Sequence, residues 1–302
     1  MSGKKQPILI IFLILGCVVL FLGLIVVFIL SFSGTSSEFA FGEKIGVIPI
    51  EGTISDSRPV TEQLDKFAKD DTIRAIILRI DSPGGGVGPS QEIYREVMKT
   101  RKTKKVIVSM GSLAASGGYY IAAAADKIVA NPGTITGSIG VIMEFVRLEE
   151  LLKKLGISLE VMKSGEFKDI GSPHRKMTER EKELIQGLLS DVQGQFVRAV
   201  AQGRKLPVEK VDEIADGRIL SGARAKELGL VDRLGNFQDA VELAKKMTGI
   251  KGEAKLVYPE KPRIRLWDFF FQGAGEALQG LIQARPPTRI EYRWNGIPSL
   301  PD

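Results

Sequence analysis

The strongest constraint on the fold is a series of short apolar runs that alternate with helical segments. Residues 73–80 and 106–110 are rich in β-branched side chains, and they predict strands that are buried on both faces. Further strands are expected at 45–50, 127–130 and 157–163. Helices are expected at 60–69, 89–100 and 145–155, and another is expected to follow the strand at 106–110 and to end at residue 125. This alternation indicates an α/β fold with largely parallel strands.

The second half of the chain has a helical pattern. Thr178 and Glu181 have the spacing of a capping box, which predicts the start of a helix over 179–203. Shorter helices are expected at 208–214, 221–228 and 236–246, and the C-terminal tail contains adjacent aromatics (Trp267, Phe269, Phe270, Phe271) and a strand-like stretch at 289–294. We therefore expect one main domain at 45–250. A C-terminal tail follows it at 251–302, and the sequence does not indicate how this tail packs.

The N-terminal segment resembles a membrane anchor. Residues 8–30 carry no charged side chain, and as a helix they would extend about 34 Å, enough to cross a bilayer core. Lys4 and Lys5 precede this run, whereas residues 31–37 contain no Lys or Arg. The positive-inside rule then predicts a cytoplasmic tail at 1–7, an anchor at 8–30, a linker at 31–44 and an extracytoplasmic domain in a cell membrane protein.

Two processed forms compete with this interpretation. A cleaved signal peptide is disfavoured because the apolar run is longer than usual and no small-x-small site follows it. The stretch 14–17, which ends in Cys17, loosely resembles a lipoprotein cleavage box, but the apolar run continues beyond it. Retention as a single-pass anchor is therefore the expectation.

Composition excludes several classes of function. The net charge is +6, and the 42 basic and 36 acidic residues are interleaved along the chain, which argues against a nucleic-acid partner. Because the chain has one cysteine and one histidine (His174), it cannot form an internal disulfide or a four-ligand structural zinc site.

Two glycine-rich turns follow the two buried strands, at residues 81–86 (DSPGGG) and 111–118 (GSLAASGG). Neither turn matches a phosphate loop or a dinucleotide fingerprint. Their unobstructed backbone N–H groups could instead form an oxyanion hole at the carboxyl ends of the strands. Ser116 lies in the second turn at the expected start of a helix, where developing negative charge is favoured.

Taken alone, Ser116 reads as a helix cap among small residues, and its sequence context is not the Gly-x-Ser-x-Gly elbow. A serine nucleophile needs a base. His174 lies among charged residues and reads as an exposed loop side chain. A lysine base would have to be neutral near pH 7, which costs about 4–5 kcal/mol relative to its ordinary pKa of about 10.4. The residues themselves do not identify which lysine this would be.

Six motifs occur in order, and together they resemble the signal peptide peptidase A (SppA) family in its short form with one catalytic domain. They are residues 81–86, 114–120 (AASGGYY), 136–141 (TGSIGV), 164–173 (SGEFKDIGSP), 215–218 (ADGR) and 229–232 (GLVD). The resemblance covers roughly residues 45–250. It implies a fold of the ClpP/crotonase type, with repeated ββα units and helical additions, preceded here by one transmembrane helix.

The resemblance also implies a site and a reaction. Ser116 would be the nucleophile, Lys168 the general base and Ser138 the residue that orients the lysine. Gly117 and a glycine of the first turn, Gly85 foremost, would donate to the oxyanion. The family forms ring- or dome-shaped homo-oligomers that degrade remnant signal peptides, and it needs no metal or organic cofactor.

Three other functions are weighed against this expectation. A related membrane peptidase could cut one specific protein partner. A crotonase-like enzyme would act on an acyl-CoA and would not need Ser116 or Lys168. A tethered scaffold without activity would tolerate any residue at both positions, so the presence of both catalytic types argues against it.

Overall fold

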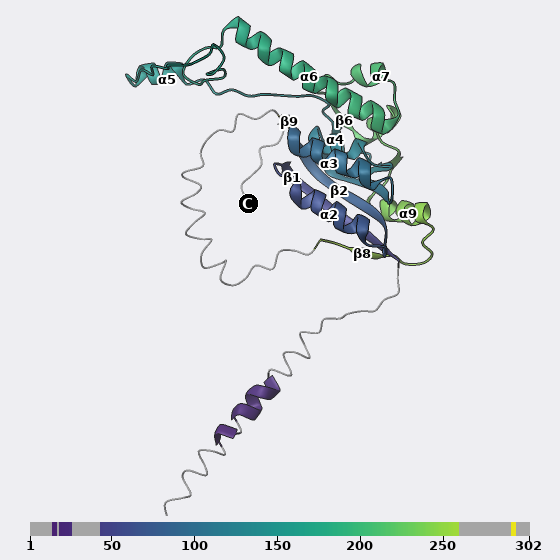
Figure 1. The fold of residues 1–302 in the computed structure, drawn as a ribbon. Coiled ribbons are helices and arrows are strands. Elements are labelled where there is room, and N and C mark those ends of the chain that lie inside the picture. The colour runs from purple at the N-terminus through teal and green to yellow at the C-terminus, as the bar shows by residue number, and fades with distance from the viewer. Residues whose placement is uncertain (1–13, 17, 26–42, 260–290, 294–302) are drawn as a thin grey trace, which may run out of the picture. The chain divides into compact units, whose positions relative to one another are not determined.

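The computed structural model describes residues 14–16, 18–25, 43–259 and 291–293. The chain divides into two units, Met1–Phe41 and Gly42–Asp302. The described residues of the first unit are helical. The second unit contains the sheet and the helices that carry the site (Figure 1).

The second unit is built on a mainly parallel sheet (Figure 1). Its central path runs β6-β5-β3-β2-β1-β8, β4 pairs with β3 and β7, and β9 pairs with β2. The strands are β1 (Lys44–Ile54), β2 (Ile73–Gly86), β3 (Lys105–Ala115), β4 (Lys127–Ala130), β5 (Ile135–Gly137), β6 (Ile219–Ser221), β7 (Arg233–Leu234), β8 (Lys255–Val257) and β9 (Glu291–Arg293). Only β5–β6 and β2–β9 pair antiparallel among the named strands. The predicted α/β fold with a largely parallel sheet is confirmed.

Helices bury both faces of the sheet. On one face lie α2 (Arg58–Lys69), α3 (Val87–Thr100), α4 (Gly117–Ala123) and the C-terminal half of α6 (Glu179–Arg204). On the other face lies α9 (Phe237–Thr248). Neighbouring residues of one strand point to opposite faces, so Ile76 packs in the first core and Ile77 in the second. This explains why the strand sequences are continuously apolar.

Shorter elements complete the unit: α5 (Glu149–Lys154), α7 (Val208–Asp212) and α8 (Gly222–Glu227). The predicted capping box is present at the start of α6. The Glu181 N–H donates to Thr178 Oγ1 at 3.2 Å, and the Thr178 N–H donates to Glu181 Oε2 at 2.8 Å. Both bonds satisfy N–H groups that the first helical turn leaves free.

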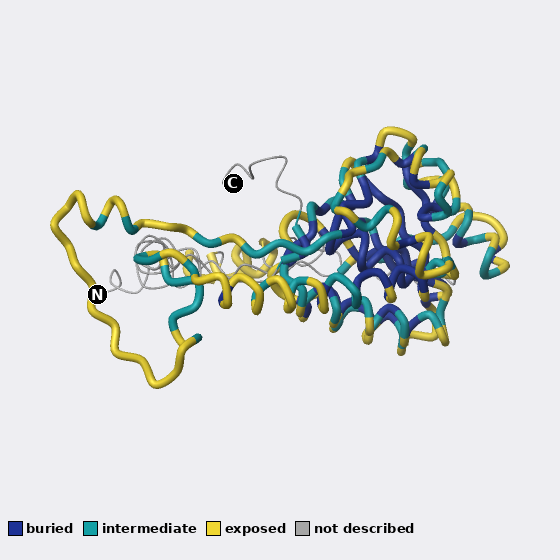
Figure 2. Tube along the Cα trace, turned by 90° about the horizontal axis from the view of Figure 1, so that it is seen from above, coloured by how far each residue is buried: buried dark blue, intermediate teal, exposed yellow. Residues whose placement is uncertain are grey.

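Residues 143–178, which we call the arm, differ from the sequence-based expectation. The helix expected at 145–155 is limited to α5, which buries none of its residues, and the strand expected at 157–163 is absent. Ile157, Leu159 and Val161 are all exposed. The apolar pattern predicted a strand, but no described strand pairs with this stretch. Figure 2 shows a long, mostly exposed stretch of chain that extends away from the buried core.

The expected membrane localisation requires correction. In the ranges that the structure describes, no helix is both long enough and apolar enough to cross a membrane. This finding contradicts the expected localisation as a single-pass cell-membrane protein with a cytoplasmic N-terminus and an extracytoplasmic catalytic domain. Within 8–30, residues 14–16 and 18–25 are helical, and the other positions, Cys17 included, lie outside the described residues. The linker expected at 31–44 lies outside them up to residue 42.

Candidate active site

Ser116 occupies a sharp turn between β3 and α4. Its backbone has φ 52° and ψ −117°, a conformation that non-glycine residues rarely adopt and that costs about 1–3 kcal/mol. Two hydrogen bonds hold the turn: the Ser116 N–H donates to the Gly137 carbonyl, and the Tyr120 N–H donates to the Ser116 carbonyl, each at 2.8 Å. The Ser116 Oγ is buried and has no hydrogen-bond partner among the described residues. A strained turn between a strand and a helix is typical of a nucleophilic serine.

The two glycine-rich turns meet beside Ser116. A Cβ added to Gly84 would stand 2.6 Å from the Gly117 backbone nitrogen, and one added to Gly117 would stand 3.2 Å from the Gly85 nitrogen. Gly84 also has a φ of +100°, which favours glycine. A side chain at Gly117 would collide with Ser90 Oγ at 2.6 Å. The close approach of these backbones therefore requires glycine, and it brings Gly85 and Gly117 together.

Ser82 and Ser138 support the same site from either side. The buried Ser82 hydroxyl donates to the Gly52 carbonyl at 2.6 Å and accepts from the Gly84 N–H at 3.1 Å. Ser138 is also buried, with φ 50°, and its N–H donates to the Arg218 carbonyl at 2.8 Å. It directly follows Gly137, whose carbonyl binds the Ser116 N–H. Four of the five predicted site residues, Ser116, Gly117, Gly85 and Ser138, thus come from adjoining segments.

The fifth predicted residue, Lys168, does not join them within one chain. Lys168 lies in a turn of the arm with its side chain exposed, and its N–H donates to the Gly165 carbonyl at 3.2 Å. Because Ser116 Oγ has no hydrogen-bond partner among the described residues, Lys168 makes no hydrogen bond with it. His174 also lies in the arm, where its Nδ1 is 2.7 Å from Ser172 Oγ, so it is not the base for Ser116 in this structure.

A charged network holds the base of the arm to the start of α6. The Arg175 guanidinium contacts the Asp169 carboxylate at 2.7 Å and the Glu181 carboxylate at 2.5 Å. Lys163 adds a second contact to Asp169 at 2.6 Å. The Arg175 hydrogen bond and the Thr178 N–H lower the pKa of Glu181 to about 2, while Arg175 and Lys163 hold the pKa of Asp169 well below its ordinary value.

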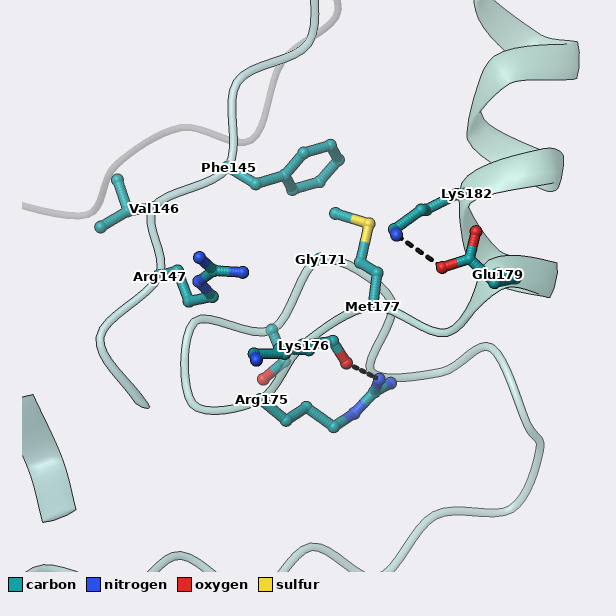
Figure 3. A pocket seen from close by; sticks show the side chains of 10 residues that line it. Phe145, Val146, Arg147, Gly171, Arg175, Lys176, Met177, Glu179 and Lys182 are labelled. Carbon is teal, nitrogen blue, oxygen red and sulfur yellow. Dashed lines mark hydrogen bonds and ion pairs between the residues drawn. The ribbon is translucent and has the colours of Figure 1, made fainter. Parts of the chain in front are cut away.

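Beside this network the arm encloses a separate hollow (Figure 3). Phe145, Arg147, Met177 and Lys182 line it together with Arg175, and none of the expected catalytic residues does. In the close-up, Lys182 is paired with Glu179, and the Arg175 guanidinium binds the Lys176 carbonyl at 3.0 Å. The hollow is therefore a feature of the arm and does not belong to the Ser116 site.

The lowered pKa of Glu181 predicts a pH-dependent stability difference. The free energy that ionised Glu181 contributes is present above about pH 4.3, its ordinary pKa, and is lost as the pH falls toward about 2. We expect Glu181→Gln to lower the melting temperature at neutral pH, and the gap to the unmodified protein to narrow below about pH 4.3. Thermal unfolding from pH 2 to 8 measures this, with the exposed Glu179→Gln as the matched control. A difference in melting temperature that stays constant or widens in acid would contradict the lowered pKa of Glu181.

Comparisons with known proteins show similarity to proteases. Residues 98–251 match the model of peptidase family S49, and residues 42–134 match the Clp protease model. A protein of Synechocystis sp. is 46% identical over 227 residues, which cover 74% of this chain and 82% of the relative. A protein of Methanocaldococcus jannaschii is 35% identical over 299 residues, covering 91% and 96%. Both are named as putative proteases. The chloroplastic serine protease SPPA of Arabidopsis thaliana is 34% identical over 262 residues, covering 83% of this chain and 39% of the relative.

The α/β fold with its mainly parallel sheet is consistent with the ClpP-like fold, and the matches to a peptidase family and to proteases make the protein a serine peptidase. The chain belongs to peptidase family S49, the family of signal peptide peptidase A. The resemblance that the six motifs carried is therefore confirmed, as is the enzyme class.

Sequence reasoning missed three residues that shape the site. Ser82 and Ser90 lie within or just after the first glycine turn, and nothing in their spacing signals that their hydroxyls contact the turn backbone or approach Gly117. Tyr292 is the third. The stretch 289–294 was expected to be strand-like, and its described residues, 291–293, do form β9, but the sequence does not show that β9 pairs with Gly84–Gly86.

Proposed function

We propose that the chain cleaves peptides with a Ser–Lys dyad, in which Ser116 is the nucleophile and Lys168 the general base. One observation carries the proposal: the buried, unpartnered Ser116 hydroxyl lies on a strained turn where two glycine backbones converge. In peptide cleavage, the substrate carbonyl must lie near a nucleophile, and its oxygen must lie near N–H donors. This arrangement supports both requirements.

The proposed reaction follows from these groups. Ser116 Oγ attacks the peptide carbonyl carbon, its proton passes to Lys168 Nζ, and the carbonyl electron pair moves onto the oxygen. The N–H groups of Gly117 and Gly85 stabilise that oxyanion. The Lys168 ammonium then protonates the leaving amine as the C–N bond breaks. Water hydrolyses the acyl-enzyme with the same lysine accepting its proton.

Gly85 is the favoured first-turn donor because the Gly84 N–H is already bound to Ser82 Oγ at 3.1 Å. Ser138, buried beside the Gly137 carbonyl that positions Ser116, is proposed to orient the lysine through its hydroxyl. Neither role requires a metal or an organic cofactor.

We further propose that Lys168 reaches the Ser116 of a neighbouring copy in a homo-oligomer. Within one chain the lysine is exposed on the arm and makes no hydrogen bond with Ser116 Oγ. The arm also exposes a group of large apolar side chains, namely Val146, Leu148, Leu151, Leu155, Ile157, Leu159, Val161 and Met162. Apolar patches of this kind mark protein–protein contacts. An arm that packs on a second copy would bury them and bring its lysine to that copy's serine.

The proposed substrates are remnant signal peptides left after their release from secreted proteins. Support comes from an Enterococcus faecium relative named as a putative signal peptide peptidase SppA, which is 38% identical over 226 residues. The direct comparison is the rate at which the protein degrades a synthetic signal peptide and a folded secreted protein. Degradation of the signal peptide alone supports the proposal, and preference for the folded protein contradicts it.

The nucleophile is tested by covalent labelling with a fluorophosphonate probe, followed by peptide mapping. We expect one labelled residue, Ser116, and slower labelling in Lys168→Ala because the serine then lacks its base. Equal labelling rates in the two proteins, or a label on another serine, would refute the dyad.

A further inference from the structure

The strained turn at Ser138 is held from two sides by the loop 215–218. Ser138 has a φ of 50°, and a non-glycine residue in this region persists only where its surroundings hold it there. The Ser138 N–H donates to the Arg218 carbonyl at 2.8 Å, and the Gly217 N–H donates to the Ile139 carbonyl at 3.1 Å. The position of the Ser138 hydroxyl therefore depends on where this loop lies.

The side-chain amide of Gln193, on α6, joins the same two segments. Its Nε2 donates to the Ala215 carbonyl at 2.6 Å and, over a longer distance of 3.4 Å, to the Ile139 carbonyl. Only the nitrogen of an amide carries N–H groups, so only that end can face two carbonyl oxygens. The other end, Oε1, is buried and has no hydrogen-bond partner among the described residues. Because an unpaired buried acceptor is costly, the two carbonyls must fix the orientation of this amide.

The two segments meet at glycines. A Cβ added to Gly140 would stand 3.1 Å from the Gly217 Cα, so the backbones approach without side chains between them at this point. On the Gln193 side the junction opens into a hollow of about 320 Å³, which Val141 and Ala215 help to line. Packed side chains therefore do not fill this side of the junction, and the bonds from Gln193 tie it to α6.

We propose that Gln193 is a positioning residue, which holds Ser138 in the strained conformation that lets its hydroxyl orient Lys168. Gln193 acts through the Ile139 and Ala215 carbonyls and touches none of the reacting atoms. The inference rests on the proposed roles of Ser138 and Lys168. Because Lys168 is exposed on the arm, the residue that receives it must be fixed by other parts of the fold, and Gln193 provides that support.

The first test measures kcat and KM of the full chain on a labelled peptide. Gln193→Met keeps the length of the side chain and removes both N–H groups, and we expect kcat to fall at least about tenfold with KM within about threefold. Gln193→Glu places oxygens against the two carbonyls and should lower kcat at least as much. Unchanged kcat in both variants, or a loss that appears only in KM, would overturn the inference.

Gln186→Met is the matched control. Gln186 lies on α6 and lines the same hollow, but its side chain is exposed. The control should keep kcat within about twofold of the unmodified protein. An equal loss of kcat in Gln186→Met and Gln193→Met would show that the hollow tolerates no methionine, and would also overturn the inference.

A double-mutant cycle separates positioning from a general structural role. Ser138→Ala removes the hydroxyl that Gln193 is proposed to place, so Gln193→Met should cost no more than about a further twofold in kcat in that background. Losses that multiply would mean that Gln193 acts independently of Ser138, and the inference would fall. It would fall equally if Ser138→Ala left kcat unchanged.

A change in the loop itself guards against a folding defect in the Gln193 variants. The exposed Asp216 carboxylate binds the Arg218 guanidinium at 2.6 Å and the Arg218 N–H at 3.0 Å. Asp216→Ala loosens the loop without altering a buried group, and should lower kcat at least about threefold at an unaltered melting temperature. A kcat that this change leaves intact would refute the role of the loop.

Failure of the inference can be told apart from failure of the proposed function. Activity that survives Ser116→Ala or Lys168→Ala would refute the dyad, whatever the Gln193 variants do. Activity that requires Ser116 and Lys168 but is indifferent to Gln193→Met would refute only the positioning role.

Discussion

Replacing Ser116 with alanine is expected to lower kcat/KM for peptide cleavage by at least about 10⁴-fold, because no acyl-enzyme can form without the hydroxyl. The fold should survive, since Oγ makes no hydrogen bond among the described residues. The strained turn is fixed by its backbone bonds to Gly137 and Tyr120, which alanine retains. Steady-state hydrolysis of a labelled peptide, with the melting temperature as the check on folding, measures the effect.

The matched control is Ser112→Ala. Ser112 lies in the same glycine-rich turn, four residues earlier, but its side chain is exposed. This variant should keep activity within about twofold of the unmodified protein, as surface changes away from a site usually do. Comparable losses in both variants would show that the turn is merely sensitive to substitution, and would remove Ser116 as the nucleophile.

Lys168→Ala is expected to lower kcat/KM by about 10²–10⁴-fold, the contribution of a positioned general base. The control is Lys154→Ala, an exposed lysine on α5 of the same arm. Its removal should leave kcat/KM within about twofold. Equal effects of the two changes would mean that the arm needs positive charge in general, and Lys168 would no longer be the base.

Co-expression of the Ser116→Ala and Lys168→Ala chains decides whether the dyad forms between copies. Each variant alone is expected to have a strongly reduced kcat/KM. If Lys168 serves a neighbour, random mixing in a closed ring joins an intact serine and an intact lysine at about one site in four, and up to about a quarter of the activity returns. If the dyad forms within one chain, no site is intact. Mixed oligomers that remain inactive would therefore refute a dyad formed between copies.

The arm shows why local sequence patterns mispredict some segments. Ile157, Leu159 and Val161 have the alternation of a strand, yet they are exposed and form no ladder. A strand needs a neighbour to satisfy its N–H and C=O groups, and alternation does not report whether one exists. The uncharged run at 8–30 predicted a membrane anchor from local composition alone. Its length and polarity fit a bilayer, but no described helix meets that requirement.

The proposed active site combines what sequence and structure supply separately. The ordered motifs identified the family and singled out Ser116, Gly117, Ser138 and Lys168, but only through resemblance. A serine among small residues has the same local sequence whether it caps a helix or attacks a carbonyl. The positive φ, the buried hydroxyl and the converging glycines distinguish the two, and these are properties of three segments that meet in space.

The sequence by itself determined the α/β architecture, because β-branched runs that are apolar at every position can be satisfied only by burial on both faces. It also determined where α6 begins, as the Thr178–Glu181 capping box shows. Only the tertiary structure decided that Lys168 is exposed on the arm and makes no hydrogen bond with Ser116 Oγ, and that Tyr292 pairs with Gly85. Such contacts join residues far apart in the chain, and they depend on how whole strands and the arm are placed, which no local pattern encodes.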